Sequence, residues 1–349
     1  MLNLSSNDYL GIASNASLRK EFLETVLDME SIPSFGSSSS RLLTGNFDEH
    51  DQLEQKISSL YNRESALIFN SGYHMNSGII PPLMEKGDLI LSDKLNHASI
   101  IDGILLSKAE YYRFNHGDIE QLELILEKHR GNAKNAMIIT ESLFSMDGDI
   151  PDLVRITELS KKYNTLLYVD EAHSFGVYGK QGLGLCEELN IIDKVDIIGG
   201  TFGKSAASTG AFIVCENEVK ELLINKCRSV IFSTNISPLQ TAWTRFVLDR
   251  IVQMQVERCH LKNISTILTG GSPKLIKCDE NWSMITPIIT GTDKSALDLA
   301  EFLQSNGYYA LPIRPPTVPV NSARVRLSLT ADMTFEEVTG LSIVIRNEI

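Results

Sequence analysis

Two short segments of this chain carry a carboxylate, an imidazole and an amine that could act together in one reaction. Residues 170–176 (DEAHSFG) contain Asp170 and His173, and residues 200–205 (GTFGKS) contain Lys204. Each segment follows a short apolar run, so its polar side chains are expected at strand ends, where open α/β sheets place their sites. A buried carboxylate such as Asp170 can keep the ring nitrogen of the cofactor protonated, and the amine of Lys204 can form a Schiff base with its aldehyde. Together the two segments predict a pyridoxal 5'-phosphate enzyme.

Each of these residues also has an ordinary structural explanation. An aspartate at the end of a strand is often only a helix cap, and a lysine between small residues is usually an exposed loop residue. The prediction therefore depends on the combination of Asp170 with Lys204 and not on either residue alone.

His97, in residues 96–99 (NHAS), is a further candidate because it follows the apolar run 89–91 and a short polar loop. An imidazole stacked on the cofactor ring would hold the ring and could pass protons. The alternative is a surface histidine with no role in chemistry.

A phosphate site is expected where residues 70–73 (NSGY) lead from an apolar run into a helical pattern. Backbone N–H groups at a helix start bind anions, and Gly72 allows a close approach, so we assign Gly72 and Tyr73 to the cofactor. Thr201 lies three residues before Lys204, so its hydroxyl can hold the phosphate while the amine reaches the aldehyde. A plain helix start is the alternative.

Composition narrows the class of protein. The chain has 349 residues, of which 43% are hydrophobic and 22% charged, so it can bury a large core and is expected to form two domains. It contains no run of about 18 apolar residues and no basic-then-apolar start, so we expect a cytoplasmic protein with no membrane span and no secretory peptide. A net charge of −12 and a pI near 5.1 argue against nonspecific nucleic-acid binding.

Cysteines and histidines predict neither disulfides nor a metal site. The five cysteines are widely spaced without a Cys-x-x-Cys motif, which is typical of reduced thiols, and no His-x-x-x-His pair occurs. The cysteines are Cys186, Cys215, Cys227, Cys259 and Cys278.

The order of apolar runs predicts the fold class. Runs of strand length alternate with longer helical patterns, which favours an α/β fold with a mainly parallel sheet covered on both faces. The expected strands are residues 66–69, 88–91, 137–140, 166–169, 197–198 and 211–214.

The last third of the chain has a different pattern of predicted helices and strands. Residues 237–260 predict one long helix, and from Pro273 onward short strands at 284–289 and 323–329 precede an acidic helix after Thr334. We expect a smaller C-terminal α+β domain. The expected boundaries are an N-terminal segment 1–35, a large cofactor-binding domain 36–255 and a small domain 256–349.

Motifs along essentially the whole chain resemble those of the α-oxoamine synthases, a family of fold-type I pyridoxal phosphate enzymes. Besides the segments around Asp170 and Lys204, they are residues 5–11 (SSNDYLG), 40–45 (SRLLTG), 96–99 and 323–331 (ARVRLSLTA). The resemblance implies a transferase with a large and a small domain that condenses an amino acid with an acyl thioester, with loss of CO₂.

Residues 313–319 (IRPPTVP) favour one branch of that family. This branch acts in biotin synthesis on L-alanine and a pimeloyl group carried by CoA or by an acyl carrier protein. The alternatives are sister enzymes that make 2-amino-3-oxobutyrate or 5-aminolevulinate. A non-catalytic subunit on the same fold is a further alternative, although such subunits typically lose the lysine that is present here as Lys204.

The resemblance also implies roles for single residues. Lys204 forms the Schiff base, Asp170 pairs with the pyridinium nitrogen, and His97 stacks on the ring. His173 bonds the phenolic oxygen of the cofactor, and Ser142 matches another cofactor contact.

Substrate contacts are implied in the same way. Asn7 and Arg326 match positions that hold the amino-acid carboxylate, for which a guanidinium is well shaped, and Arg314 and Thr317 are assigned to the substrate. Arg326 alternates with Arg324 along an apparent strand, so the side chain of at least one of the two arginines should point out of the core. Two solvated arginines on an edge strand are the alternative.

Residues 232–235 (FSTN) resemble the segment whose hydroxyl reaches the phosphate of a neighbouring subunit. This implies a homodimer with composite sites, in which Thr234 contacts the partner's cofactor. The alternative is that Thr234 caps a helix beginning near Ser237. The serine run 37–40 is expected to let the backbone pass close to a ligand or a neighbouring subunit.

Two features depart from the family pattern. The family carries a longer segment before the block at residues 5–11, including an arginine of the acyl-substrate site, and residues 205–211 are a mild variant that keeps Gly210. The contacts to the acyl chain are therefore the least defined part of the expected site.

Overall fold

The computed structural model describes residues 1–270 and 282–348, which fall into two compact units. The large unit comprises residues 15–142 and 151–253. The small unit comprises residues 1–14, 143–150 and the described residues from Met254 onward. The domain boundaries expected at residues 35 and 255 remain a prediction, and Cys278 lies outside the described residues.

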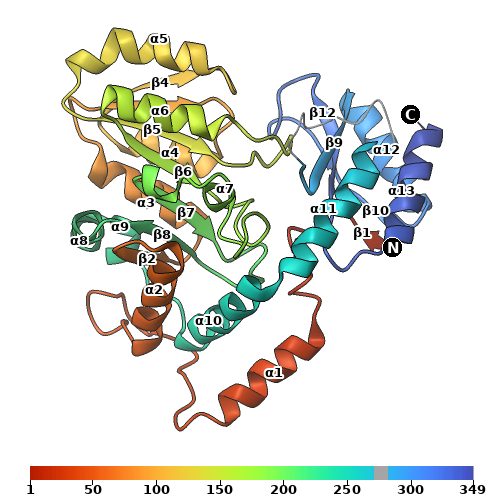
Figure 1. The fold of residues 1–349 in the computed structure, drawn as a ribbon, viewed down its shortest axis with the longest axis horizontal. Coiled ribbons are helices and arrows are strands. Elements are labelled where there is room, and N and C mark those ends of the chain that lie inside the picture. The colour runs from red at the N-terminus through yellow and green to blue at the C-terminus, as the bar shows by residue number, and fades with distance from the viewer. Residues whose placement is uncertain (271–281, 349) are drawn as a thin grey trace. The chain divides into compact units, whose positions relative to one another are not determined.

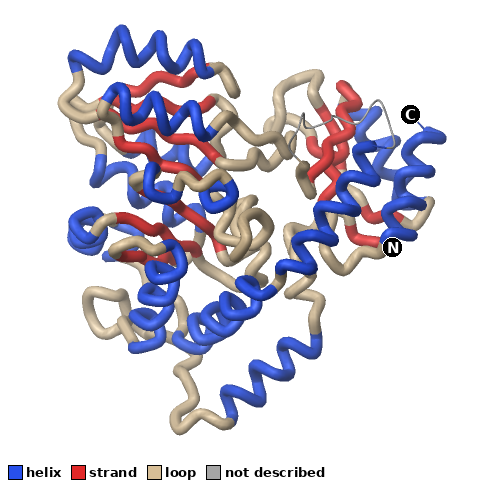
Figure 2. Tube along the Cα trace, in the orientation of Figure 1, coloured by secondary structure: helices blue, strands red, loops and turns tan. Residues whose placement is uncertain are grey.

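A seven-stranded sheet forms the centre of the large unit in the described part of the chain (Figures 1 and 2). All neighbouring strands are parallel except β8, which runs antiparallel to both of its neighbours. In spatial order the strands are β2 (Ser65–Phe69), β8 (Ala211–Cys215), β7 (Ile197–Thr201), β6 (Leu166–Asp170), β5 (Ala136–Glu141), β3 (Leu89–Asp93) and β4 (Glu110–Phe114). The predicted mainly parallel α/β sheet is confirmed.

The edge strand β4 is the one strand of this sheet that the apolar runs did not predict. Its sequence, EYYRF, is mostly solvent-exposed, and only Phe114 is buried. A strand at the edge of a sheet does not need a continuous apolar run, so its pattern resembles a polar loop.

Helices cover both faces of the sheet, as expected for parallel strands. On one face, Leu67, Phe69 and Ile213 form a core cluster with Met75 and Ile79 of α3. The helices of the large unit are α1 (Ala16–Leu27), α2 (Asp48–Tyr61), α3 (Gly72–Leu83), α4 (Ala98–Leu106), α5 (Ile119–His129), α6 (Leu153–Tyr163), α7 (Leu185–Glu188), α8 (Asn217–Lys226), α9 (Arg228–Ile231) and α10 (Pro238–Gln253), with 3₁₀ turns at Arg130–Asn132 and Ile192–Lys194.

The single long helix expected over residues 237–260 is wrong. The chain forms α10 and then α11 (Gln255–Gly270), with a turn at Met254 between them. Val247 and Ile251 are buried in the large unit, whereas Leu261 and Ile264 are buried in the small unit. Because no proline or glycine marks the break and both helices keep their apolar residues at helical spacing, the sequence shows one continuous pattern.

The small unit contains a three-stranded antiparallel sheet in the order β11-β12-β9 among the described residues. Strand β1 pairs with β10 in a separate short ladder. The predicted strands at 284–289 and 323–329 and the acidic helix after Thr334 are confirmed. The elements are β1 (Leu2–Asn3), α11, β9 (Ile285–Gly291), α12 (Asp293–Ser305), β10 (Tyr308–Tyr309), β11 (Pro312–Ile313), β12 (Ala323–Ser328) and α13 (Phe335–Glu348).

Candidate active site

The carboxyl ends of neighbouring parallel strands bring the candidate residues of the large unit to one edge of the sheet. Asp170 is the last residue of β6, and it pairs in register with Gly199 of β7, three residues before the loop that carries Lys204. On its other side Asp170 pairs with Glu141, the last residue of β5. The expected placement of Asp170 and Lys204 at strand ends is confirmed.

The carboxylate of Asp170 is buried, with 3% of the residue exposed, and both oxygens are bonded. Oδ1 accepts the backbone N–H of Ala172 at 2.8 Å, a turn bond of the kind expected for a cap. Oδ2 accepts the side-chain amide of Asn76, also at 2.8 Å. A helix cap needs only the first of these bonds. The second bond, to the buried Asn76 of α3, holds the Asp170 carboxylate in a fixed orientation at the strand end.

A chain of hydrogen bonds connects Asp170 to His97. The Asn76 amide that bonds Asp170 also donates to Ser99 Oγ at 3.0 Å, and Tyr168 Oη donates to the other end of the same amide. Ser99 Oγ lies 2.8 Å from His97 Nδ1, which also accepts the Ser99 N–H at 3.3 Å. Because Nδ1 accepts, the proton of the neutral imidazole resides on Nε2.

His97 follows β3 and precedes α4, and it keeps an exposed face. Desolvation by the surrounding protein lowers the pKa of His97, Asp170 opposes this effect, and the positive charge of Lys204 adds to it. The imidazole is therefore neutral near pH 7. Asp170 and Lys204 are therefore both close enough to His97 to affect its pKa.

The loop between β7 and β8 presents Lys204. Ala207 N–H donates to the Lys204 carbonyl at 2.9 Å, and Phe202 N–H donates to the Gly210 carbonyl at 2.9 Å, so the loop closes on itself. Gly210 has a φ of +101°, and a Cβ there would lie 2.8 Å from the carbonyl oxygen of Phe69. Only glycine fits this position without strain.

The expected anion site has the geometry of a helix start facing a hydroxyl. Helix α3 begins at Gly72, and Ser71 caps it by accepting the His74 N–H at 3.1 Å. A Cβ placed on Gly72 would lie 3.8 Å from Thr201 Oγ1, so the free N–H groups of α3 and the Thr201 hydroxyl border the same space. Tyr73 is half exposed and donates to Asp102, and its cofactor role remains a prediction.

Ser142 and His173 are buried at the same edge of the sheet. Ser142 Oγ donates to Glu171 Oε2 at 3.0 Å and lies 2.7 Å from Ser174 Oγ. Glu171 also accepts the backbone N–H groups of Leu185 and Cys186, at 2.9 and 2.7 Å. This buried carboxylate holds the loop after β6 together, and the cofactor roles of Ser142 and His173 remain predictions.

Thr234 is exposed, and it does not cap α10. The helix begins at Pro238, and Ser237 supplies the cap, because its Oγ accepts the Gln240 N–H at 3.1 Å. The alternative that Thr234 is an N-cap is therefore wrong. Its carbonyl instead accepts the side-chain amide of Asn70 at 2.6 Å, immediately before the start of α3.

The substrate residues of the small unit form their own cluster. Arg326 donates to Asn7 Oδ1 at 2.6 Å and to Tyr9 Oη at 3.2 Å, which unites residues expected to hold one carboxylate. Arg324 is 5% exposed and pairs with Asp147. The alternative of two solvated edge arginines is wrong, because β12 is the central strand of its sheet.

Arg314 and Thr317 lie in the exposed turn between β11 and β12, where Thr317 N–H donates to the Arg314 carbonyl at 3.0 Å. Neither side chain belongs to the Arg326 cluster in the described hydrogen bonds. Their substrate roles remain predictions.

Sequence reasoning missed Asn76 and Glu141. Asn76 lies inside a helix, where nothing in the sequence indicates a partner, so only the fold reveals it. Glu141 directly follows the apolar run of β5, the same position that Asp170 has on β6, and that pattern could have found it. Glu141 Oε1 accepts the backbone N–H of His97 at 2.6 Å, so it fixes the start of α4.

Burial and the neighbouring charge of Asp170 raise the pKa of Glu141 to about 8, so it is protonated at neutral pH. An acid whose pKa is higher in the folded than in the unfolded state loses stability as pH rises from the unfolded to the folded value. In cofactor-free protein, Glu141→Gln should therefore gain stability relative to wild type between about pH 5 and pH 8, by up to about 1.4 kcal/mol per pH unit. Thermal unfolding across this range measures the difference. The exposed Glu301→Gln is the control, and equal pH slopes for wild type and Glu141→Gln would contradict the assignment.

In the described residues, no three His, Cys, Asp or Glu side chains gather in a way that could hold a metal ion. None of the helices in that part of the chain is long and apolar enough to cross a membrane. Cys186, Cys215 and Cys227 are buried free thiols, and Cys259 is an exposed one.

The residues at this edge fit pyridoxal 5'-phosphate. A buried, oriented carboxylate suits the ring nitrogen, a lysine lies within electrostatic range, and a helix start facing a hydroxyl suits a phosphate. Three distinct parts of one ligand thus have matching groups on adjacent strand ends.

Comparisons with known proteins agree with this fit. The family model of class I and II aminotransferases matches residues 1–342. A curated relative from Haemophilus influenzae, named "Putative 8-amino-7-oxononanoate synthase", is 51% identical over 98% of this chain and 90% of its own length.

Two solved structures are also similar. A serine palmitoyltransferase variant from S. paucimobilis with a bound PLP–myriocin aldimine has a TM-score of 0.90 at 28% identity, covering 99% of this chain and 86% of that one. The 8-amino-7-oxononanoate synthase from Francisella tularensis has a TM-score of 0.82 at 28% identity, covering 100% and 98%.

Proposed function

We propose a specific reaction for this chain, which belongs to the family of class I and II aminotransferases. The chain is a PLP-dependent acyltransferase of the fold-type I class. The proposed reaction is the decarboxylative condensation of L-alanine with pimeloyl-CoA, or with a pimeloyl carrier protein, to give 8-amino-7-oxononanoate in biotin synthesis. The identity to the Haemophilus relative supports this choice of substrates.

One observation carries the chemistry: the hydrogen-bonded chain Asp170–Asn76–Ser99–His97, with Lys204 in electrostatic range. When bound, pyridoxal 5'-phosphate supplies an electron sink for the carbanion at the amino-acid Cα. Asp170, fixed by Asn76, holds a proton on the ring nitrogen. Gly72 at the start of α3 would bind the phosphate through its backbone N–H, and Thr201 Oγ1, which donates to the Gly210 carbonyl at 3.1 Å in this structure, would turn its proton to the phosphate.

The protein's own groups then move the protons. Lys204 Nζ would take the proton from the Cα of alanine as a general base. The imidazole of His97 would lie against the ring of the bound cofactor and exclude water from one face. Lys204 Nζ, which then carries the proton taken from Cα, or His97 would return a proton to Cα after CO₂ has left. Asn7 and Arg326 bind the carboxylate of alanine as a paired amide and guanidinium. Arg314 and Thr317 are proposed as further contacts to the substrate.

We also propose a homodimer with composite sites, in which Thr234 reaches the phosphate bound by the partner subunit, and a cytoplasmic location. Thr234 is exposed, and its carbonyl accepts the side chain of Asn70 immediately before α3. This position supports a role for Thr234 at a phosphate. An acyl carrier protein is the proposed partner if the pimeloyl group is not carried by CoA.

A product assay tests the substrates. Purified protein with L-alanine and pimeloyl-CoA should give 8-amino-7-oxononanoate, identified by mass spectrometry, together with CO₂ and free thiol. The same assay with glycine plus acetyl-CoA, glycine plus succinyl-CoA, and serine plus palmitoyl-CoA covers the sister reactions. A higher kcat/KM for any of these pairs would replace the proposed substrates without changing the enzyme class.

A further inference from the structure

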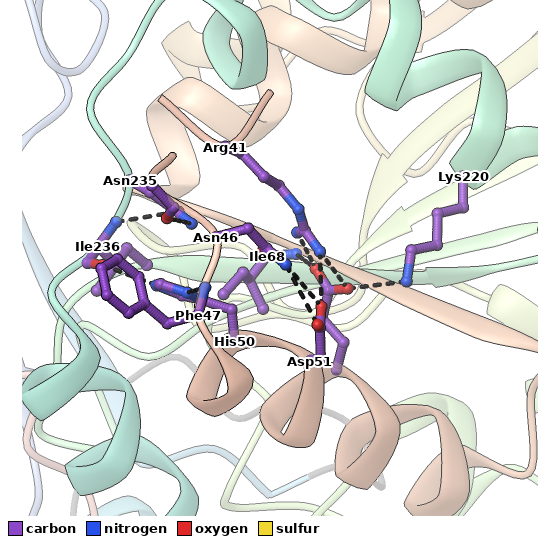
Figure 3. A network of polar contacts seen from close by, with 11 residues as sticks. Arg41, Asn46, Phe47, His50, Asp51, Ile68, Lys220, Asn235 and Ile236 are labelled. Atoms are coloured by element: carbon purple, nitrogen blue, oxygen red, sulfur yellow. Dashed lines mark hydrogen bonds and ion pairs between the residues drawn. The ribbon is translucent and has the colours of Figure 1, made fainter. Parts of the chain in front are cut away.

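The segment that carries Thr234 is tied to a buried polar network on α2 that the proposed chemistry does not use. Figure 3 shows part of this network, with His50 and Asp51 of α2 beside Arg41 and Lys220. A second acidic residue of α2 pairs with both Arg41 and Lys220. That acidic residue is Glu54, which is 2% exposed. His50 and Glu54 are four residues apart and therefore share one face of α2.

Glu54 anchors three separate parts of the chain. It pairs with the guanidinium of Arg41, accepts Lys220 Nζ at 2.8 Å, and accepts the backbone N–H of Ile68 in β2 at 3.0 Å. Arg41 also lies 3.5 Å from Asp51. Two cations therefore face two carboxylates, and the buried charge of Glu54 is fully compensated.

His50 is fully buried, with 0% exposed, and its two nitrogens have different partners. Nδ1 accepts the backbone N–H of Phe47 at 3.0 Å, so the proton is on Nε2, which donates to the carbonyl of Ile236 at 2.8 Å. The first bond completes the start of α2, and the second holds the loop after Thr234 (Figure 3).

The serine run and the motif 40–45 complete the attachment of this loop. Ser37 Oγ donates to the same Ile236 carbonyl at 2.6 Å, and Ser40 forms a β-bridge with Thr234. Asn235 donates its backbone N–H to Ser39 and its side-chain amide to Gly45. At the other end, Asn70 next to the start of α3 holds the Thr234 carbonyl at 2.6 Å.

We infer that His50 is a positioning residue for the cofactor phosphate: through its bond to the Ile236 carbonyl it fixes the Thr234 segment beside the start of α3. The inference rests on the proposed phosphate site, and it holds whether Thr234 serves the phosphate of its own subunit or of its partner. It gives a function to the serine run and to residues 40–45, which the proposed reaction leaves unassigned.

Two substitutions separate the two bonds of His50. The amide oxygen of His50→Asn can replace Nδ1 and keep the bond from Phe47 N–H, but the side chain is too short to reach Ile236. The amide nitrogen of the longer His50→Gln can replace Nε2 and keep the bond to the Ile236 carbonyl. The test is the ratio of the dissociation constants for pyridoxal and pyridoxal 5'-phosphate, ligands that differ only in the phosphate.

His50→Gln should keep this ratio within about threefold of wild type, whereas His50→Asn should lower it about tenfold or more. An equal ratio in wild type and His50→Asn would overturn the inference. This includes the case in which His50→Asn weakens the binding of both ligands by the same factor, which is the result expected of a general structural role. If His50→Asn does not fold, Ser37→Ala replaces it, because this variant removes the other donor to the Ile236 carbonyl. Ser37→Ala should also lower the ratio, and an unchanged ratio in Ser37→Ala would overturn the inference.

The outcome is separable from that of the proposed reaction. The ratio uses neither alanine nor an acyl thioester, so it can show the effect even if the product assay selects another substrate pair. Conversely, wild-type formation of 8-amino-7-oxononanoate with an unaffected ratio in His50→Asn would sustain the reaction and remove His50 from the phosphate site.

Discussion

Replacing Lys204 with alanine should abolish turnover and the yellow colour that the purified wild-type protein is expected to show. Lys204 is the lysine whose charge reaches both His97 and Glu141, and no other residue is proposed to bond covalently to the cofactor aldehyde. Borohydride should fix the cofactor to wild-type protein and not to the variant, as read by the mass of the intact protein. Turnover should fall by at least about 10³-fold, the scale seen when a catalytic nucleophile is removed.

The fold should survive this change, because the loop around Lys204 is held by backbone bonds and by Gly210. Circular dichroism and the unfolding midpoint of the variant provide that control. A colourless wild-type protein that ignores added pyridoxal 5'-phosphate would remove the cofactor site from this edge of the sheet. An active Lys204→Ala protein would assign the covalent bond to another lysine.

Asp170→Asn should retain the cofactor but lose most of its ability to remove the α-hydrogen of alanine. The amide cannot keep the ring nitrogen protonated, although it can still occupy the space beside Asn76. Loss of one buried electrostatic partner typically costs about 10²–10³-fold in rate. Exchange of the α-hydrogen of alanine in D₂O, followed by proton NMR, measures this step without an acyl substrate.

Asn76→Ala is the matched companion of Asp170→Asn, because it removes the group that orients the carboxylate and leaves the charge in place. Its exchange rate should lie between those of wild type and Asp170→Asn. Unimpaired exchange in Asp170→Asn would show that the ring nitrogen does not depend on this carboxylate.

The sequence alone determined every described strand of the large sheet except β4, and the position of its two main functional residues. The apolar runs of β6 and β7, with a helical pattern between them along the chain, favour parallel neighbours. Parallel neighbours end at one edge of a sheet, so Asp170 and Lys204 were expected to lie close together. The start of α3 at Gly72 was equally evident, because Ser71 and the helical pattern after it mark a helix start.

Tertiary structure decided the groups that orient those residues. Asn76 and Ser99 lie on different helices, and only the packing of α3 against α4 lets one amide bridge Asp170 and Ser99. The protonated state of Glu141 depends on burial beside another carboxylate, which no local pattern contains. The break at Met254 and the bond from His50 to Ile236 also depend on tertiary contacts that no local pattern contains. Periodicity reports which face of an element is buried, whereas its partners are chosen by contacts between residues far apart in the chain.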